Sequence, residues 1–452
     1  MKKTLLIASC AMVLLPAFAQ AQNIVTRKCG LDLVKEKMAQ QNPQLLQSIE
    51  QQENMLVNQP ATANKTTGSG VIPVVFHICL TQAQFNRIGG NTGIAQRIDS
   101  QMTVLNRDFN RGNGDSTMIP SVFKPLYASI GIKFSLAHTA PNGHGTAGWE
   151  VKIVSGTDTV YDVTTGASGS GFACSDAKYG TNKGLAGWDN SKYLNIWICD
   201  ITDGGQQGIL GITTPPSFTS GGFPAAEEGI VLSYLAFGKR KSAFDYYFSG
   251  IDKGRTLTHE MGHFFELLHI WGNTSPGVSP SCADDDGISD TPKQSDANFG
   301  CPTFPKVNCT SSTGGEMFMN YMDYSDDGCM MMFTAGQATK MGQQVNGGNS
   351  TPLTQNPGLT QWPLAIAEVG NKNEFTIAPN PTKGSVNISF SQVTTSLKDI
   401  RITNTMGQQV KSIAVSGQNT GYNVDLSGVS KGIYFVQCIF ADEMISRKIV
   451  VE

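Results

Sequence analysis

Charged residues and histidines are both scarce in this chain. Only 15% of its 452 residues are charged and the formal net charge is −3, so it offers no basic surface for nucleic acid and we expect no such partner. Beyond the N-terminal apolar run, no stretch approaches the ~20 apolar residues that a membrane-spanning helix needs, and we expect no transmembrane segment in the mature protein. With 40% hydrophobic residues, the chain is long enough to form two or three globular domains.

The N-terminus has the features of a secretory signal. Met1–Lys3 precedes an apolar run from Leu5 to Leu15, and Ala17–Ala19 fits the small-residue rule for cleavage. We predict a signal peptide over residues 1–19 and a protein that is exported through the periplasm and is then secreted or held at the cell surface. Residues 20–66 are rich in Gln, Asn and Lys and are predicted to form a pro-segment.

Three of the six histidines lie within eleven residues, at His259, His263 and His269. Histidines four residues apart project from one face of a helix and can share a metal ion, and the third completes a set that leaves one coordination position open. Glu260 stands where it can take a proton from a metal-bound water. The spacing predicts a hydrolytic zinc site. The alternative, a helix with two solvated histidines, leaves the glutamate and the third histidine unexplained.

The hydrophobic pattern predicts an α/β domain around this motif. Runs typical of buried strands lie at residues 71–80, 132–137, 193–201 and 229–237. A helical stripe from Ile94 to Phe109 follows Thr92, which we expect to cap that helix. The metal-site helix is expected to begin near Thr256 or Thr258.

The C-terminal part has a different character. Residues 346–370 are rich in Asn, Gly, Thr, Gln and Pro and are predicted to be a linker. Short alternating segments separated by turn residues then predict a small all-β sandwich over residues 371–452. This unit has no histidine, so we assign it no catalysis.

Nine of the ten cysteines lie beyond the predicted signal peptide, and an exported protein favours disulfides. Four of them cluster after the histidine motif in a region rich in Asp, Gly, Pro and Ser: Cys282, Cys301, Cys309 and Cys329. We expect them to staple a loop-rich subdomain, and their spacing leaves three pairings open. Because nine is odd, at least one thiol should stay outside any pairing.

Further segments accompany the histidine run. Arg255–Thr258 leads into it, Tyr193–Trp197 lies within one of the predicted strands, and Asn320–Asp327 follows it in the chain. Together these segments resemble the metzincin clan of zinc endopeptidases and, within it, the pappalysin (cytophagalysin) family. The resemblance implies an α/β metzincin-like catalytic domain over residues 67–345, with a mixed twisted sheet, long helices and a loop-rich, disulfide-stapled lower subdomain. It also implies a secreted zinc endopeptidase that acts on proteins or peptides.

The resemblance assigns roles residue by residue. Zinc would be bound by His259, His263 and His269, and Glu260 would be the general base. Met322 would pack beneath the metal as a Met-turn residue, and Tyr324 would stabilise the tetrahedral oxyanion. Without the resemblance, Met322 and Tyr324 would be taken for core and turn residues.

Latency is implied by a second match. Arg27–Gly30 resembles the cysteine switch of metzincin pro-segments, in which Cys29 would bind zinc until the pro-segment is cut. The alternative is a disulfide from Cys29 to Cys79, Cys174 or Cys199.

One residue departs from the clan pattern. Glu266 stands three residues after the second histidine, where the clan has glycine at the end of the helix. If that position needs a positive φ, a side chain there costs ~1 kcal/mol. The alternative function is therefore a catalytically impaired surface adhesin or binding protein on a metzincin fold.

The family pattern also implies structural and specificity sites. It pairs Cys282 with Cys309 and Cys301 with Cys329, while a bridge between Cys174 and Cys199 has less support. Structural calcium is expected in the acidic loop after the motif, with candidate ligands Asp286, Asp290 and Thr291. A merely solvated acidic loop is the alternative. The family lines its specificity pocket with an acidic side chain near the Met-turn, so Asp326 and Asp327 are candidates, and Gly328 could stand there instead.

The last segment resembles the C-terminal sorting domain of proteins exported by the type IX secretion system. The matching pieces are residues 378–381, 404–407, 426–428 and 432–434. The resemblance implies that the secretion machinery is a partner. An accessory binding module is the alternative, but no aromatic stripe on alternate positions favours it.

Overall fold

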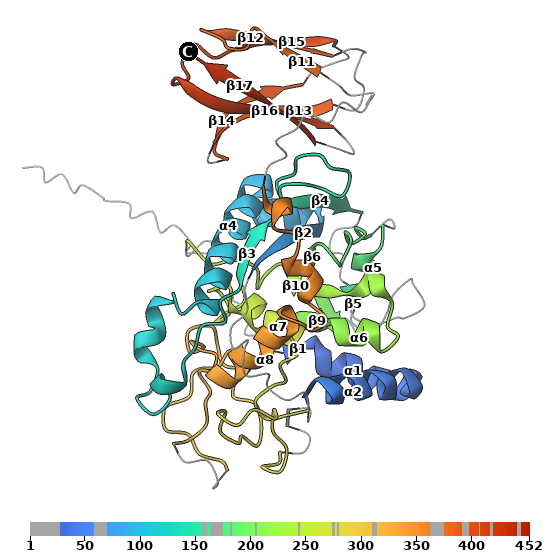
Figure 1. The fold of residues 1–452 in the computed structure, drawn as a ribbon, viewed down its shortest axis with the longest axis vertical. Coiled ribbons are helices and arrows are strands. Elements are labelled where there is room, and N and C mark those ends of the chain that lie inside the picture. The colour runs from blue at the N-terminus through green and yellow to red at the C-terminus, as the bar shows by residue number, and fades with distance from the viewer. Residues whose placement is uncertain are drawn as a thin grey trace, which may run out of the picture.

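The structure is a computed structural model that describes residues 28–57, 70–155, 161–162, 175–180, 183–203, 206–242, 245–273, 276–277, 280–309, 314–361, 375–390, 397–405, 407–415, 419–440 and 444–452 (Figure 1). The predicted signal peptide, Arg27 and Cys174 lie outside these residues. No helix among the described residues is long and apolar enough to cross a membrane.

A mixed seven-stranded sheet organises the domain that carries the histidine motif, the predicted catalytic domain. Its strand order is β1-β9-β10-β6-β2-β3, with β4 also paired to β2. The strands are β1 (Lys28–Cys29), β2 (Val71–Thr81), β3 (Lys133–Leu136), β4 (Trp149–Val154), β6 (Leu194–Cys199), β9 (Ile209–Thr214) and β10 (Gly229–Ser233). The pair of β9 and β10 is antiparallel and the other pairs are parallel, which confirms the predicted mixed sheet. Four of these strands correspond to the predicted ones, although β10 ends before residue 237.

The helices and short elements surround this sheet. The helices are α1 (Gly30–Gln41), α2 (Pro43–Val57), α3 (Gln82–Arg87), α4 (Gly90–Phe109), α5 (Ser175–Lys178), α6 (Pro216–Ser220), α7 (Arg255–Phe264), α8 (Ala335–Val345) and α9 (Thr351–Thr354). Single turns of 3-10 helix are η1 (Gly114–Met118), η2 (Lys124–Leu126), η3 (Ala225–Glu227) and η4 (Pro357–Thr360). A minor sheet is formed by β5 (Tyr161–Asp162), β7 (Ile201–Asp203) and β8 (Gln206–Gln207).

The long helix α4 buries its predicted apolar stripe against the sheet and α7. Ile94, Ile98 and Leu105 lie in the same core cluster as Leu257 and Met261 of α7. The predicted cap at Thr92 is wrong, because α4 already begins at Gly90, after Gly89 in the left-handed region at φ 88°. Glycine reaches that conformation without strain, so the N-cap lies at Gly89, three residues before the predicted one.

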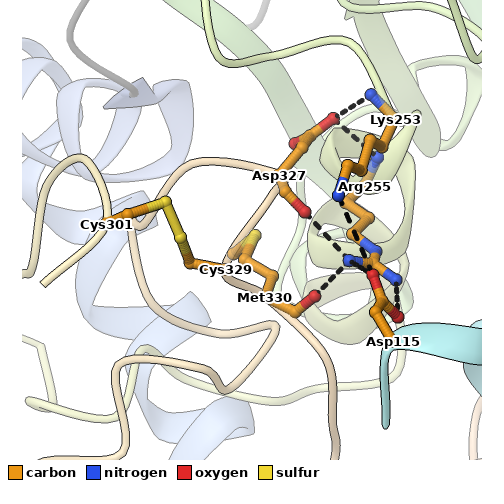
Figure 2. Close-up of a disulfide and its surroundings, with 7 residues drawn as sticks. All are labelled: Asp115, Lys253, Arg255, Cys301, Asp327, Cys329 and Met330. Carbon is orange, nitrogen blue, oxygen red and sulfur yellow. Dashed lines mark hydrogen bonds and ion pairs between the residues drawn. A yellow bond between two sulfur atoms is a disulfide. The ribbon is translucent and has the colours of Figure 1, made fainter. Parts of the chain in front are cut away.

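The catalytic helix α7 starts at Arg255, one residue before the predicted range, because Gly254 turns the chain at φ 80°. Arg255 makes a two-pronged ion pair with Asp115 at 2.7 Å and donates to the carbonyl oxygens of Asp327 and Met330 (Figure 2). The disulfide Cys301–Cys329 lies next to this network. The start of α7 is therefore joined directly to the segment that follows the predicted Met-turn.

Below α7 the chain forms the predicted loop-rich subdomain, drawn in yellow and orange in Figure 1. Among its described residues, none between α7 and α8 belongs to a regular helix or strand. Two disulfides cross-link it: Cys282–Cys309, with Cα atoms 5.7 Å apart, and Cys301–Cys329, with Cα atoms 5.6 Å apart. Both are the pairs that the family pattern implies.

The predicted linker begins too early. Leu353 of α9 belongs to the main core, and the carbonyl oxygen of Leu359 accepts from the amides of His138 and Thr139 at 2.8 and 3.1 Å. Residues 351–361 thus pack on the catalytic domain, because two leucines in a polar segment find apolar partners there. The remainder of the predicted linker lies outside the described residues.

The C-terminal unit is the predicted sandwich. One sheet contains β11 (Phe375–Ala378), β12 (Ser385–Phe390) and β15 (Gly421–Asp425); the other contains β14 (Gln409–Ala414), β13 (Leu397–Asn404), β16 (Gly432–Phe440) and β17 (Met444–Val451). Alternate residues of β12 and β16 are buried in a separate core.

Candidate active site

Helix α7 and the turn after it bring the three histidines together. The Nε2 atom of His263 lies 3.2 Å from that of His259 and 3.1 Å from that of His269. The sulfur of Cys29 joins them, and the four ligand atoms lie within 4.8 Å of one another. Among the described residues, this is the one group of three or more His, Cys, Asp or Glu side chains placed to share an ion.

The rings are oriented by contacts on their far sides. Nδ1 of His259 donates to the carbonyl oxygen of Tyr321 and Nδ1 of His263 to that of Leu267, each at 2.7 Å. This leaves Nε2 of both rings as a lone-pair donor toward the centre of the group. Burial lowers the pKa of His263 to about 4, and burial with the neighbouring imidazoles lowers that of His269 far below its usual value. Neutral imidazoles with converging lone pairs fit a metal ion.

The turn between His263 and His269 contains Glu266 at the position where the clan has glycine. Glu266 adopts φ 66°, its amide donates to the carbonyl of His263 at 2.9 Å, and the amide of Leu267 donates to Gly262 at 2.9 Å. The Glu266 carboxylate accepts from the amide and the hydroxyl of Ser217, at 3.1 and 2.8 Å. Burial raises the pKa of this carboxyl to about 8. The turn therefore forms with glutamate in it, and His269 still reaches the other two histidines.

Glu260 faces strand β9 beside the histidines. Its carboxylate accepts from the hydroxyl of Thr213 at 2.8 Å and lies 3.7 Å from the sulfur of Cys29. A Cβ on Gly211 would come within 2.6 Å of the Glu260 side chain, so this position of β9 must be glycine for Glu260 to fit. Sequence reasoning missed Thr213 and Gly211, since β9 was not predicted as a strand.

Met322 and Tyr324 both lie close to the histidine group. A Cβ on Gly262, between the two helical histidines, would come within 2.3 Å of the Met322 sulfur, so Met322 packs directly beneath α7. The Tyr324 ring lies 4.9 Å from that of His269, and Trp271, which sequence reasoning missed, stacks on His269 at 4.4 Å. Burial, with Asp32 nearby, raises the pKa of Tyr324 well above its usual value, so its hydroxyl stays a donor.

The predicted pro-segment closes the site. Strand β1 pairs in parallel with β9, with Cys29 opposite Gly211. The amide of Cys29 donates to the Tyr324 hydroxyl at 3.2 Å, and that hydroxyl donates to Asp32 at 3.1 Å. Burial, Glu260 and Asp32 all raise the pKa of the Cys29 thiol, so it becomes a thiolate only beside a cation. The structure places Cys29 at the histidines rather than in a disulfide.

The predicted calcium ligands are only partly brought together. Asp286 is buried, and one of its carboxylate oxygens accepts from Thr291 at 2.7 Å while the other has no hydrogen-bond partner. Burial raises the pKa of Asp286 to about 7. Asp290 instead accepts from the hydroxyl of Thr334 and the amide of Gly336, at 2.7 and 2.8 Å. Asp290 therefore stabilises the N-terminus of α8, where the first amides of the helix have no partner within the helix. Its carboxylate bonds to that helix end and not to the Asp286 group.

The two residues predicted to determine specificity, Asp326 and Asp327, lie in different environments. The Asp327 carboxylate is fully buried and accepts from the amides of Lys253 and Arg255, at 2.8 and 3.3 Å, as Figure 2 shows. It stabilises the start of α7, because the first amides of a helix have no partner within the helix. The contacts of Asp327 thus favour a structural role at the start of α7. Asp326 is half-buried beside Gly250 and stays a candidate.

These features define a class. The fold and the site are those of a metzincin-type metallopeptidase. One helix carries two histidines, and a tight turn leads to the third. A methionine packs beneath them, and strand β9 of the mixed sheet is antiparallel to β10.

Comparison with known proteins identifies the family. A peptidase family model described as pregnancy-associated plasma protein-A matches residues 181–346, and one described as a secretion system C-terminal sorting domain matches residues 376–452. The chain is 33% identical to promirolysin of Tannerella forsythia, covering 73% of this chain and 97% of that one, with a TM-score of 0.59. It is 35% identical to mature mirolysin solved with a cleaved peptide, covering 65% of this chain and 99% of that one, with a TM-score of 0.55.

A curated relative is likewise a metalloprotease. An extracellular metalloprotease of Arthroderma benhamiae is 28% identical over 305 residues, which cover 66% of this chain and 82% of that protein. The chain belongs to the pappalysin family of metalloproteases and carries a type IX sorting domain. It is a secreted or cell-surface enzyme.

Proposed function

We propose that this protein is a zinc-dependent endopeptidase made as a latent zymogen. The observation that carries the proposal is the convergence of three imidazole Nε2 atoms and the Cys29 sulfur within 4.8 Å, with the Glu260 carboxylate 3.7 Å from that sulfur. Three neutral nitrogens and one sulfur suit zinc better than a hard cation.

Each side chain has a distinct task in peptide hydrolysis. Zinc held by the three histidines would polarise the scissile carbonyl and lower the pKa of a bound water. Glu260 would accept a proton from the attacking water and return it to the leaving amine, and Thr213 holds its carboxylate in place at 2.8 Å. Tyr324, a protonated phenol, would donate to the developing oxyanion.

The proposed latency rests on the positions that the pro-segment occupies in the active site. Cys29 takes the position that water would need, Asp32 and the Cys29 amide engage the Tyr324 hydroxyl, and β1 covers the edge of β9. After removal of the pro-segment, β9 would become an edge strand whose free backbone groups can pair with an extended substrate. The same change would release both Tyr324 and Glu260.

The test is cleavage of a quenched peptide library by the zymogen after activation with a trypsin-type protease, which is then inhibited. We expect cleavage that a chelator abolishes and that the Glu260→Ala variant lacks, with about one zinc per chain in the uncleaved protein. The alternative, an impaired binding protein, predicts bound zinc without cleavage in any sample. The ordered turn at Glu266 favours the enzyme, because His269 reaches its place.

We also propose that Asp286 and Thr291 contribute to a structural calcium site. The support is the second oxygen of Asp286, which is buried without a partner, since oxygen ligands of this kind suit calcium. Calcium should raise the Tm of the wild-type protein and not that of Asp286→Asn. An equal shift in both proteins would leave Asp286 as a buried acid only.

A further inference from the structure

A small, partly open space lies beside the second histidine, at the end of α7. The catalytic domain lines it with Pro215, His263, Glu266, Leu267 and Leu268, and the pro-segment lines it with Leu31 and Glu53. Its volume is about 10 Å³, which is close to that of one water-sized probe. Both pro-segment residues leave on activation, so this part of the cleft then opens toward solvent.

Glu266 is the feature of this space that the catalytic residues do not explain. A glycine at φ 66° would be free of strain, whereas a side chain there costs ~1 kcal/mol. The glutamate places a carboxylate in the lining, where Ser217 donates once to each of its oxygens. A carboxylate oxygen can accept two hydrogen bonds, so both keep capacity for another donor.

Charged side chains of both the pro-segment and the catalytic domain lie near Glu266. Glu53 is paired with Lys35 at 2.8 Å, so the pro-segment removes a neutral pair when it leaves. On the catalytic domain, Lys340 acts on Glu266 by its charge, but it faces Asp286 as well. One ammonium therefore faces two acidic side chains at this end of α7, and a cationic substrate group beside Glu266 would favour its ionised form, against the burial that raises its pKa.

We propose that Glu266 is a specificity residue whose carboxylate pairs with a lysine or arginine side chain of the substrate, in the place that Leu31 holds in the zymogen. The proposal rests on the peptidase function above. Pro215, Leu267 and Leu268 would contact the aliphatic stem, and the head group would reach the carboxylate. Leu31 is two residues from Cys29, and His263 lines the space, so the basic residue lies within about two residues of the scissile bond.

A purely structural role makes a different prediction. If Glu266 only joins the turn to α6 through Ser217, its replacement should slow the cleavage of every peptide to the same degree. A subsite should instead change the ratio between basic and neutral substrates. The ratio therefore separates the two roles.

The experiment compares kcat/KM for peptides that carry lysine or its uncharged counterpart norleucine at each of the two positions on either side of the scissile bond. The enzymes are the activated full-length protein, Glu266→Gln and, as a matched control, Glu228→Gln. Glu228 also bonds to α6, accepting from Thr219 at 2.8 Å, but it does not line the space. The activating protease is inhibited before each assay.

We expect the wild-type protein to prefer lysine over norleucine ~10-fold at one position, the value of a charge-assisted hydrogen bond. Glu266→Gln should lose this preference and cleave the norleucine peptide as the wild type does, and Glu228→Gln should keep it. A preference that survives in Glu266→Gln, or an equal loss for all peptides, would overturn the proposal. If Glu266→Gln does not fold, Glu266→Gly, which relieves the backbone strain, should lose the preference too.

A binding measurement separates failure of this proposal from failure of the peptidase function. Fluorescence anisotropy of the labelled lysine peptide would be followed on activated Glu260→Ala, with and without Glu266→Gln. A ~10-fold weaker affinity in the double variant supports the subsite even if no sample cleaves any peptide. Equal affinities would reject the subsite whether or not the protein is a peptidase.

Discussion

At the scale of single residues, the Cys29 sulfur is the contact that most directly opposes catalysis. Serine in its place supplies a much weaker ligand than a thiolate, so the uncut Cys29→Ser protein should cleave a quenched peptide at least ~10-fold faster than the uncut wild type. Cys438→Ser is the matched control, since Cys438 is also a buried thiol but lies in the C-terminal sandwich. Equal activity of the two uncut variants would mean that Asp32 and β1 suffice for latency.

Contacts between residues close in sequence could be predicted, and contacts between residues far apart in sequence could not. The three histidines and Glu260 lie within eleven residues, so helix geometry alone brings most of them together. The bond from the Cys29 amide to Tyr324 spans 295 residues of sequence, and only the family resemblance brought those two residues into one site. The same limit explains Asp290 and Asp327, because an acidic residue near a site can equally bond to a helix N-terminus.

At the scale of elements, strand β10 and helix α6 are joined by a half-buried carboxyl, that of Glu228, with a testable pH dependence. Burial raises the pKa of Glu228, which precedes β10, from 4.5 to about 7, while the Thr219 hydroxyl of α6 partly offsets this. The folded state therefore disfavours ionisation, and its stability falls as pH rises from about 4.5 to about 7. Glu228→Gln should raise the Tm by ~2–4 °C at pH 8, corresponding to about 1 kcal/mol, and by nothing at pH 4. Thermal unfolding at both pH values checks this, and an equal shift at both would contradict it.

Elements with strong periodicity were predictable, and short ones that depend on tertiary contacts were not. The runs of β2 and β6 are mainly apolar because both faces of those strands are buried, and the polar His77 and Asn195 within them bond to each other at 2.9 Å. Strand β9 is interrupted by Gly211, a weak strand former that is needed there because the Glu260 side chain approaches the backbone closely. The turns α9 and η4 have a linker's composition, and only the contacts of Leu353 and Leu359 show that they belong to the domain.

At the scale of the whole molecule, catalysis and export belong to separate parts of the chain. The sandwich has its own core, and none of its described residues joins the histidine group. A chain that lacks residues 375–452 should therefore, once purified and activated, cleave peptides as the full-length protein does. In a host with the type IX system, however, it should stay in the periplasm, because the sorting domain is the part that the secretion machinery reads. Immunoblots of medium and periplasm check this, with Glu260→Ala as an inactive control that should still reach the medium. Wild-type amounts of the shortened chain in the medium would show that another segment directs export.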